Sequence, residues 1–283
     1  MEECLAQGKG KLPEGEDCCL AVEKTGQKIT TLADWETYAG PKSADQWVDD
    51  RSAKEVARAW LEGAGLALPI EVAQVLAEHP SFGPVESWIA EPEAKLPFDG
   101  FAGEPRNSDL VVHATDSHGP YLIAVEAKAD EPFGETIADA AASALERLLA
   151  NDRSKGLIRI QQLAQALFGA RLQGDPAIKN MRYQLLTACA GAICEAERRG
   201  YQRAVLLIHE FVTTKTDDER HEANSAALGT FVKRLSHGVT VEVRSGSIYG
   251  PFAVPGKPLF TGTTKLFIGK VTRDLRDKMP LGT

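Results

Sequence analysis

Apolar residues along this chain recur at two spacings, and the segments that show them alternate. Spacings of three and four, typical of helices, occur at 53–61, 70–78, 136–149, 158–168, 183–199 and 218–235. Short apolar runs, typical of buried strands, occur at 108–114, 121–128, 204–209, 239–243 and 265–269. Helices and strands that alternate in this way predict an α/β fold, with a central sheet flanked by helices.

The first two predicted strands are joined by residues 116–119, whose sequence has the chemistry of a tight turn. They should form an antiparallel hairpin, so the sheet as a whole is expected to be mixed. If Ser117 and His118 form a two-residue loop, counting outward from it places Asp109 directly opposite Glu126. Side chains paired in this way point to the same face, with Cβ atoms about 5 Å apart.

Lys128 follows Glu126 by two residues, and alternation along the strand puts it on that same face. Two facing carboxylates repel each other, and a divalent cation such as Mg²⁺ or Mn²⁺ between them would relieve the repulsion. Asp109 and Glu126 are therefore candidate metal ligands, and Lys128 could stabilise developing negative charge. The alternative is that these are solvated charges at strand ends, and a register slip of one residue would separate them.

Composition and charge limit the classes of protein that fit. The chain has 283 residues, 43% of them hydrophobic and 25% charged, which is ordinary for a globular protein. Acidic residues outnumber basic ones in 1–50, and this segment shows little periodicity, so we expect an irregular N-terminal extension before a single domain at 51–283. The net charge of −8 disfavours a nucleic-acid binder held by charge alone, although 151–182 and 257–283 are locally basic.

Several motifs are missing, and each absence removes a class of function. The sequence has no phosphate-binding Gly-Lys-Ser/Thr loop, no G-x-G-x-x-G, no H-E-x-x-H and no G-x-S-x-G. No apolar run approaches the ~20 residues of a membrane span, and no secretory signal is visible, so we expect no membrane association. The five cysteines have no zinc-site spacing, which favours a reducing, cytoplasmic setting.

An acidic residue on one strand and Glu-x-Lys at the end of the next, here Asp109 and 126–128, resembles the pattern of the PD-(D/E)XK nuclease superfamily. Ser108 stands where the proline that gives the superfamily its name would be. The blocks 125–134, 182–188 and 205–211, in that order, resemble a little-characterised branch of it. The resemblance covers about 84–245 and implies a restriction-endonuclease-like core.

The resemblance implies a Mg²⁺-dependent (or Mn²⁺-dependent) phosphodiesterase that acts on DNA or RNA, with Asp109 and Glu126 as metal ligands and Lys128 as a catalytic residue. It also implies a third acidic ligand from a preceding helix, for which Glu86 and Glu91 are the candidates. Gln184 stands where the family often places a polar side chain that faces the site. The alternative for Glu86 and Glu91, which the sequence favours for each of them singly, is an acid on the surface. Gln184 can equally be a residue at the start of a helix, exposed to water.

Two further functions remain open on the sequence. A nuclease-like fold could serve as a catalytically inactive binding or assembly module, and the acidic balance of the chain favours that alternative. A metal-dependent enzyme for a small phosphorylated substrate is the third, and it would need a pocket rather than a groove.

Overall fold

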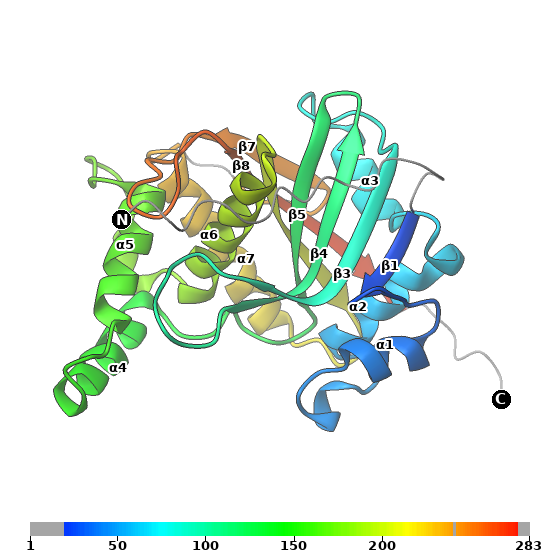
Figure 1. Ribbon diagram of the computed structural model, residues 1–283, viewed down its shortest axis with the longest axis horizontal. Coiled ribbons are helices and arrows are strands. Elements are labelled where there is room, and N and C mark those ends of the chain that lie inside the picture. The colour runs from blue at the N-terminus through cyan, green and yellow to red at the C-terminus, as the bar shows by residue number, and fades with distance from the viewer. Residues whose placement is uncertain (1–19, 240–241, 277–283) are drawn as a thin grey trace.

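The computed structural model describes residues 20–239 and 242–276, and within them the chain forms one eight-stranded mixed sheet (Figure 1). The strand order across the sheet is β2-β1-β3-β4-β5-β6-β8-β7. The strands are β1 (Leu20–Lys24), β2 (Gln27–Lys28), β3 (Ser87–Leu96), β4 (Arg106–Asp116), β5 (Gly119–Lys128), β6 (Arg203–Val212), β7 (Ser247–Phe252) and β8 (Lys265–Asp274). The expected α/β class with a mixed central sheet is confirmed.

Helices cover both faces of the sheet, and each face has its own apolar core (Figure 1). One side carries α4 (Ile137–Ala150), α5 (Gly156–Phe168), α6 (Tyr183–Arg199) and α7 (Asp218–Leu235). The other side carries α1 (Leu32–Ala39), α2 (Ser52–Leu61) and α3 (Ile70–Ala77). Short 3₁₀ turns lie at Ala44–Gln46, Glu62–Gly65 and Ile178–Asn180. In the described part of the chain, no helix combines the length and the apolar character that crossing a bilayer requires.

The hairpin turn has the predicted register, with Asp116 opposite Gly119 and Leu110 opposite Val125. β3, β4 and β5 form an antiparallel meander, after which β6 and β8 run parallel to β5. The carboxyl ends of β5, β6 and β8 therefore share one edge of the sheet. Ligands of open α/β sheets bind at such an edge, so a functional site is expected here.

Residues 20–50 differ from the expected irregular extension. β1 pairs in parallel with β3, with Val22 opposite Ala90, and Trp35 of α1 is buried in the core of that face. The boundary expected at residue 50 therefore does not separate this segment from the sheet. Only a few apolar side chains anchor it among many charged ones, which is why its sequence shows no clear period. Residues 1–19, with Cys4, Cys18 and Cys19, lie outside the described residues.

Three other segments differ from the sequence-based expectation. β3 and β7 were not predicted, and β3 takes up most of the segment from which the resemblance implied a helix. The predicted strand at 239–243 is absent at Val239, Glu242 and Val243, and residues 240–241 lie outside the described residues. β3 contains Glu-Pro-Glu, which lowers strand propensity, and only its pairing with β4 and β1 makes it a strand.

α6 approaches the sheet closely at Gly191. A Cβ on this residue would lie 2.9 Å from the Cβ of Leu96 in β3, which is closer than two such atoms can pack. We expect Gly191→Ala to lower the free energy of unfolding by about 1–3 kcal/mol, because the overlap outweighs the better helix propensity of alanine. Chemical denaturation measures this.

The matched control for Gly191→Ala is Gly229→Ala in α7, where an added Cβ would meet nothing within 4 Å. This control should leave stability unchanged or raise it by up to about 1 kcal/mol. Equal behaviour of the two variants would contradict the close packing of α6 against β3.

Candidate functional site

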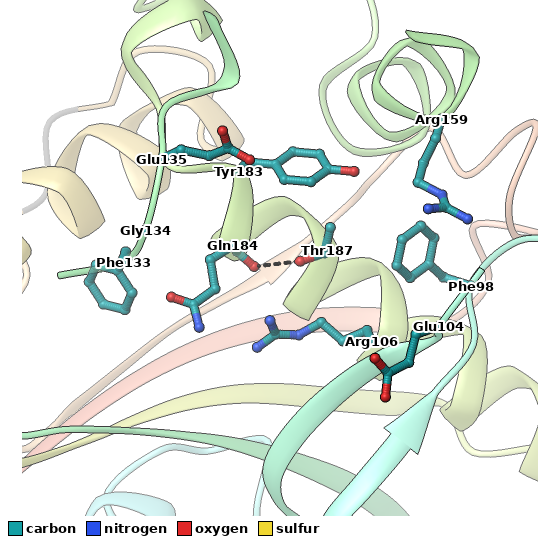
Figure 2. A pocket seen from close by; sticks show the side chains of 10 residues that line it. All are labelled: Phe98, Glu104, Arg106, Phe133, Gly134, Glu135, Arg159, Tyr183, Gln184 and Thr187. Atoms are coloured by element: carbon teal, nitrogen blue, oxygen red, sulfur yellow. Dashed lines mark hydrogen bonds between the residues drawn. The ribbon is translucent and has the colours of Figure 1, made fainter. Parts of the chain in front are cut away.

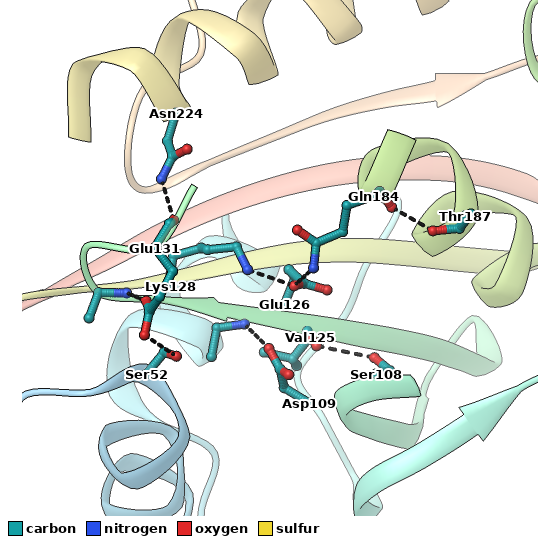
Figure 3. Close-up of polar contacts among 12 residues, drawn as sticks. Ser52, Ser108, Asp109, Val125, Glu126, Lys128, Glu131, Gln184, Thr187 and Asn224 are labelled. Carbon is teal, nitrogen blue, oxygen red and sulfur yellow. Dashed lines mark hydrogen bonds and ion pairs between the residues drawn. The ribbon is translucent and has the colours of Figure 1, made fainter. Parts of the chain in front are cut away.

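Glu126, near the carboxyl end of β5, is the centre of a buried polar cluster. Its side chain is only 3% exposed, and its carboxylate accepts a hydrogen bond from Lys128 Nζ at 2.7 Å (Figure 3). The same carboxylate accepts hydrogen bonds from the amide of Gln184 and from the guanidinium of Arg106. Charge and hydrogen bonds together compensate the cost of burying this carboxylate.

Three elements bring these side chains together. Strand alternation puts Glu126 and Lys128 on the face covered by α6, whose first turn supplies Gln184. The start of α6 is fixed by the Tyr183 N–H, which donates to the Glu135 carbonyl at 3.0 Å. Arg106 is the first residue of β4, and the pattern of the sequence gave no sign of its role. Glu126, Lys128 and Gln184 lie together, as the resemblance implies.

Asp109 lies beside this cluster, but not in the strand pair that counting from the turn predicts. The pairing of β4 with β5 ends at Leu110 and Val125, one residue pair earlier. Beyond it, Asp109 accepts a hydrogen bond from the Ala127 N–H at 2.7 Å, and Ser108 Oγ donates to the Val125 carbonyl at 3.1 Å (Figure 3). These side chains satisfy backbone groups that a continued ladder would have paired, so the strands can separate here.

The charges of the cluster shift one another's protonation. Burial and the negative charge of Glu126 raise the pKa of Asp109 to about 7. Burial works in the same direction on Glu126, but the positive charges of Lys128 and Arg106 outweigh it and lower the pKa of Glu126. Burial also opposes the charge on Lys128, yet Glu126 and Asp109 raise its pKa. At neutral pH Glu126 and Lys128 are therefore ionised, whereas Asp109 holds its proton to a higher pH than an ordinary aspartate.

The structure does not bring Glu86 or Glu91 to this cluster, which corrects the expected third ligand. The backbone N–H of Glu86 donates to the Thr115 carbonyl at 2.8 Å, near the turn of the hairpin and at the far end of β4 from Asp109. Glu91 is a strand residue whose half-exposed carboxylate pairs with Lys24 at 2.9 Å. Both glutamates lie away from the cluster because residues 87–96 form strand β3 rather than a helix, so successive side chains are spread along the sheet.

Glu93 is an acidic residue of β3 whose charge acts on Asp109. It falls between the pairs Pro92–Leu110 and Ala94–Ser108, at the level of Asp109, and has a left-handed backbone with φ 48°. Its charge helps to raise the pKa of Asp109, while burial raises its own pKa. A left-handed residue within a strand breaks the alternation, so periodicity could not have assigned Glu93 to this place.

The oxygen atoms of this cluster suit a cation such as Mg²⁺ that needs only one or two carboxylate ligands from the protein. Among the described residues, no three His, Cys, Asp or Glu side chains are grouped as a metal site. Asp109 and Glu126 offer two carboxylates, and a cation would relieve the repulsion between them, which adds to burial in raising the pKa of Asp109. Mg²⁺ commonly takes one or two protein carboxylates and keeps several water ligands, so these two residues could hold it.

A cavity of about 360 Å³ opens next to the cluster and shares Arg106 and Gln184 with it (Figure 2). Tyr183, Phe98 and Arg159 also line it. Asp109, Glu126 and Lys128 do not themselves line this cavity, and the Lys128 side chain is only 8% exposed. The basic groups of the pocket are also paired, because Arg106 contacts Glu126 and Arg159 binds Asp99 at 2.6 Å.

A second buried lysine–carboxylate pair lies one strand away. Glu210 of β6 is the register partner of Lys128, and its carboxylate lies 3.2 Å from Lys270 Nζ of β8. It also accepts a hydrogen bond from the Thr272 hydroxyl at 3.0 Å. No local sequence pattern marks this pair, because Glu210 and Lys270 lie far apart in the chain and only the parallel pairing of β6 with β8 brings them together.

Comparison with known proteins gives a family but no activity. No curated protein and no solved structure matches the chain. The model of one family, described as a domain of unknown function (DUF6946), matches residues 28–270, which include α1, all of β3–β7 and the whole Glu126 cluster. Since this match spans most of its length, the chain belongs to the DUF6946 family.

Proposed function

We propose that this protein is a Mg²⁺-dependent (or Mn²⁺-dependent) phosphodiesterase that hydrolyses DNA or RNA. The observation that carries the proposal is the buried contact of Glu126 with Lys128 and Gln184, beside Asp109. An ionised carboxylate, a carboxyl with a pKa near 7 and a charged lysine form a group that can hold a cation and stabilise a phosphoryl transition state.

Each residue has a role in this proposal. Asp109 and Glu126 would hold the metal, which would polarise the phosphoryl oxygen and lower the pKa of a bound water. Lys128 presents a positive charge to the negative charge that develops on phosphate. The amide of Gln184 holds the Glu126 carboxylate in its orientation. Arg106 contacts Glu126 and also lines the adjoining pocket, where its guanidinium could meet a phosphate.

The test of the proposed function is a metal titration with cleavage as the readout. The protein is incubated with single- and double-stranded DNA and RNA, in chelator and in increasing Mg²⁺ or Mn²⁺, alongside Glu126→Gln. We expect cleavage that requires metal and is abolished in Glu126→Gln, because this change removes a charged ligand with little change in shape. Cleavage that is equal in both proteins would come from a contaminant and contradict the proposal.

One observation favours the second candidate, an inactive binding or assembly module. Both carboxylate oxygens of Glu126 already have cationic or amide partners, so the cluster is satisfied without metal. On this reading Mg²⁺ stabilises neither the natural protein nor any variant against heat, and no substrate is cleaved. A metal-dependent rise in the midpoint of thermal unfolding that is lost in Glu126→Gln would exclude it.

A further inference from the structure

The cavity beside Glu126 has an aromatic wall. Tyr183 and Phe98 present their rings to it, and Phe133 closes another side (Figure 2). Tyr183 is held by the hydrogen bond of its N–H to the Glu135 carbonyl at 3.0 Å. Phe98 lies on the loop of residues 97–105, which Arg159 of α5 anchors through Asp99 at 2.6 Å. These two contacts fix the backbone that carries both aromatic residues.

The end of the cavity near Glu126 carries the guanidinium of Arg106, and the carboxylates of Glu104 and Glu135 also line the cavity. The Arg106 side chain is only 11% exposed, and its Nε is buried without a hydrogen-bond partner. Gln184 lies beside it in the first turn of α6, a helix whose N-terminus no side chain caps. A 17-residue helix concentrates partial positive charge at that end. The cavity thus joins an aromatic wall to an end where a guanidinium has one N–H without a partner.

A nucleotide has these two parts, a flat base and a phosphate. We propose that the cavity binds one unstacked nucleotide of a single-stranded nucleic acid, with its base against Tyr183 and its phosphate near Arg106. That the bound strand is also a substrate rests on the proposed function. The inference adds the substrate class, which neither the fold nor the metal ligands specify.

The size of the cavity favours a single strand over a duplex. A cavity of about 360 Å³ has room for a small molecule such as one nucleotide, and a double helix is far too wide to enter it. A paired base would have to be flipped out, which costs a few kcal/mol, whereas a base of a single strand is already free. Aromatic stacking then stabilises any base, with little preference for sequence.

Binding, measured apart from cleavage, tests the inference. Glu126→Gln protein in Mg²⁺ is titrated with a short single-stranded DNA that carries one fluorescent 2-aminopurine base, and with its duplex. We expect the single strand to bind at least ten times more tightly and its fluorescence to be quenched by stacking. Adding Tyr183→Leu should weaken single-strand binding about tenfold or more, whereas adding Tyr183→Phe, which keeps the ring, should preserve it.

Tyr38→Leu is the matched control, since Tyr38 is exposed and distant in sequence from the cavity. Circular dichroism and thermal unfolding verify that each variant is folded, and Tyr183→Phe covers the case in which Tyr183→Leu is not. The inference is overturned if Tyr183→Leu and Tyr183→Phe bind the strand equally, if the duplex binds as tightly as the strand, or if a nucleoside monophosphate binds as tightly as the oligonucleotide.

The inference and the proposed function can fail separately. A strand that binds through Tyr183 but is never cleaved by the natural protein removes the hydrolytic function and leaves the nucleotide cavity. Metal-dependent cleavage of duplex that Tyr183→Leu does not change removes the cavity assignment and leaves the hydrolytic function.

Discussion

Lys128→Met is expected to reduce metal-dependent cleavage by about 100-fold or more while Mg²⁺ still binds. Methionine is unbranched and nearly as long as lysine, but it lacks the charged Nζ that lies 5.5 Å from the centre of the Phe133 ring. The change removes the positive charge 2.7 Å from Glu126 and leaves both carboxylates in place. Metal affinity should be unchanged or higher, since a neighbouring positive charge no longer opposes the cation.

Lys270→Met is the matched control for this prediction. Lys270 is a buried lysine that faces a buried carboxylate, Glu210, in the same sheet, and it lies outside the proposed site. Removing either lysine leaves a buried carboxylate short of a partner, so each variant should lose stability by about 3–5 kcal/mol. Only Lys128→Met should lose catalysis when both are assayed at a temperature where they remain folded. Equal cleavage by the two variants would assign Lys128 a structural role.

Asp109→Asn is expected to stabilise the protein in chelator at pH 8, by about 1–4 kcal/mol. The native carboxyl has a pKa of about 7, whereas the ordinary value is 3.8. As pH rises from about 4 to 7, the unfolded chain loses this proton before the native protein does, so the group makes stability fall with pH. Asparagine has no such proton, and its side-chain oxygen can still accept from the Ala127 N–H.

The stability gain of Asp109→Asn should therefore be small at pH 4, grow through pH 7 and level off above it. Denaturant unfolding at several pH values in chelator measures this. In Mg²⁺ the order should reverse, because only the natural protein keeps both proposed ligands. A variant that is destabilised in chelator at every pH, with no effect of Mg²⁺ on either protein, would contradict a metal site at Asp109.

Asp116→Asn is the control with the opposite sign. Asp116 lies on the same strand and is buried, but Arg203 binds it at 2.8 Å and, against the effect of burial, lowers its pKa. Its contribution to stability is present above the ordinary pKa and is lost as pH falls. Asp116→Asn should therefore destabilise the protein at pH 8 by about 3–5 kcal/mol, while Asp109→Asn stabilises it.

Local signals in the sequence determined much of the framework. The turn at Ser117 and His118 fixes the hairpin register as far as Leu110 and Val125, because a two-residue loop allows only one pairing. Helical periodicity gave α6 and α7 their full bounds, Tyr183–Arg199 and Asp218–Leu235. Strand alternation put Glu126 and Lys128 on one face. Each of these features depends on residues that are neighbours in the chain.

Only the tertiary structure decided what surrounds Glu126. Arg106 reaches it because β4 begins at the edge where β5 ends. Asp109 lies beside it but outside the paired ladder, because side-chain hydrogen bonds replace the last backbone pairs of the two strands. Glu93 comes close through a left-handed residue in β3, a strand that exists only because its neighbours pair with it. Contacts among segments far apart in the chain depend on how the sheet and helices pack, and no local pattern records that packing.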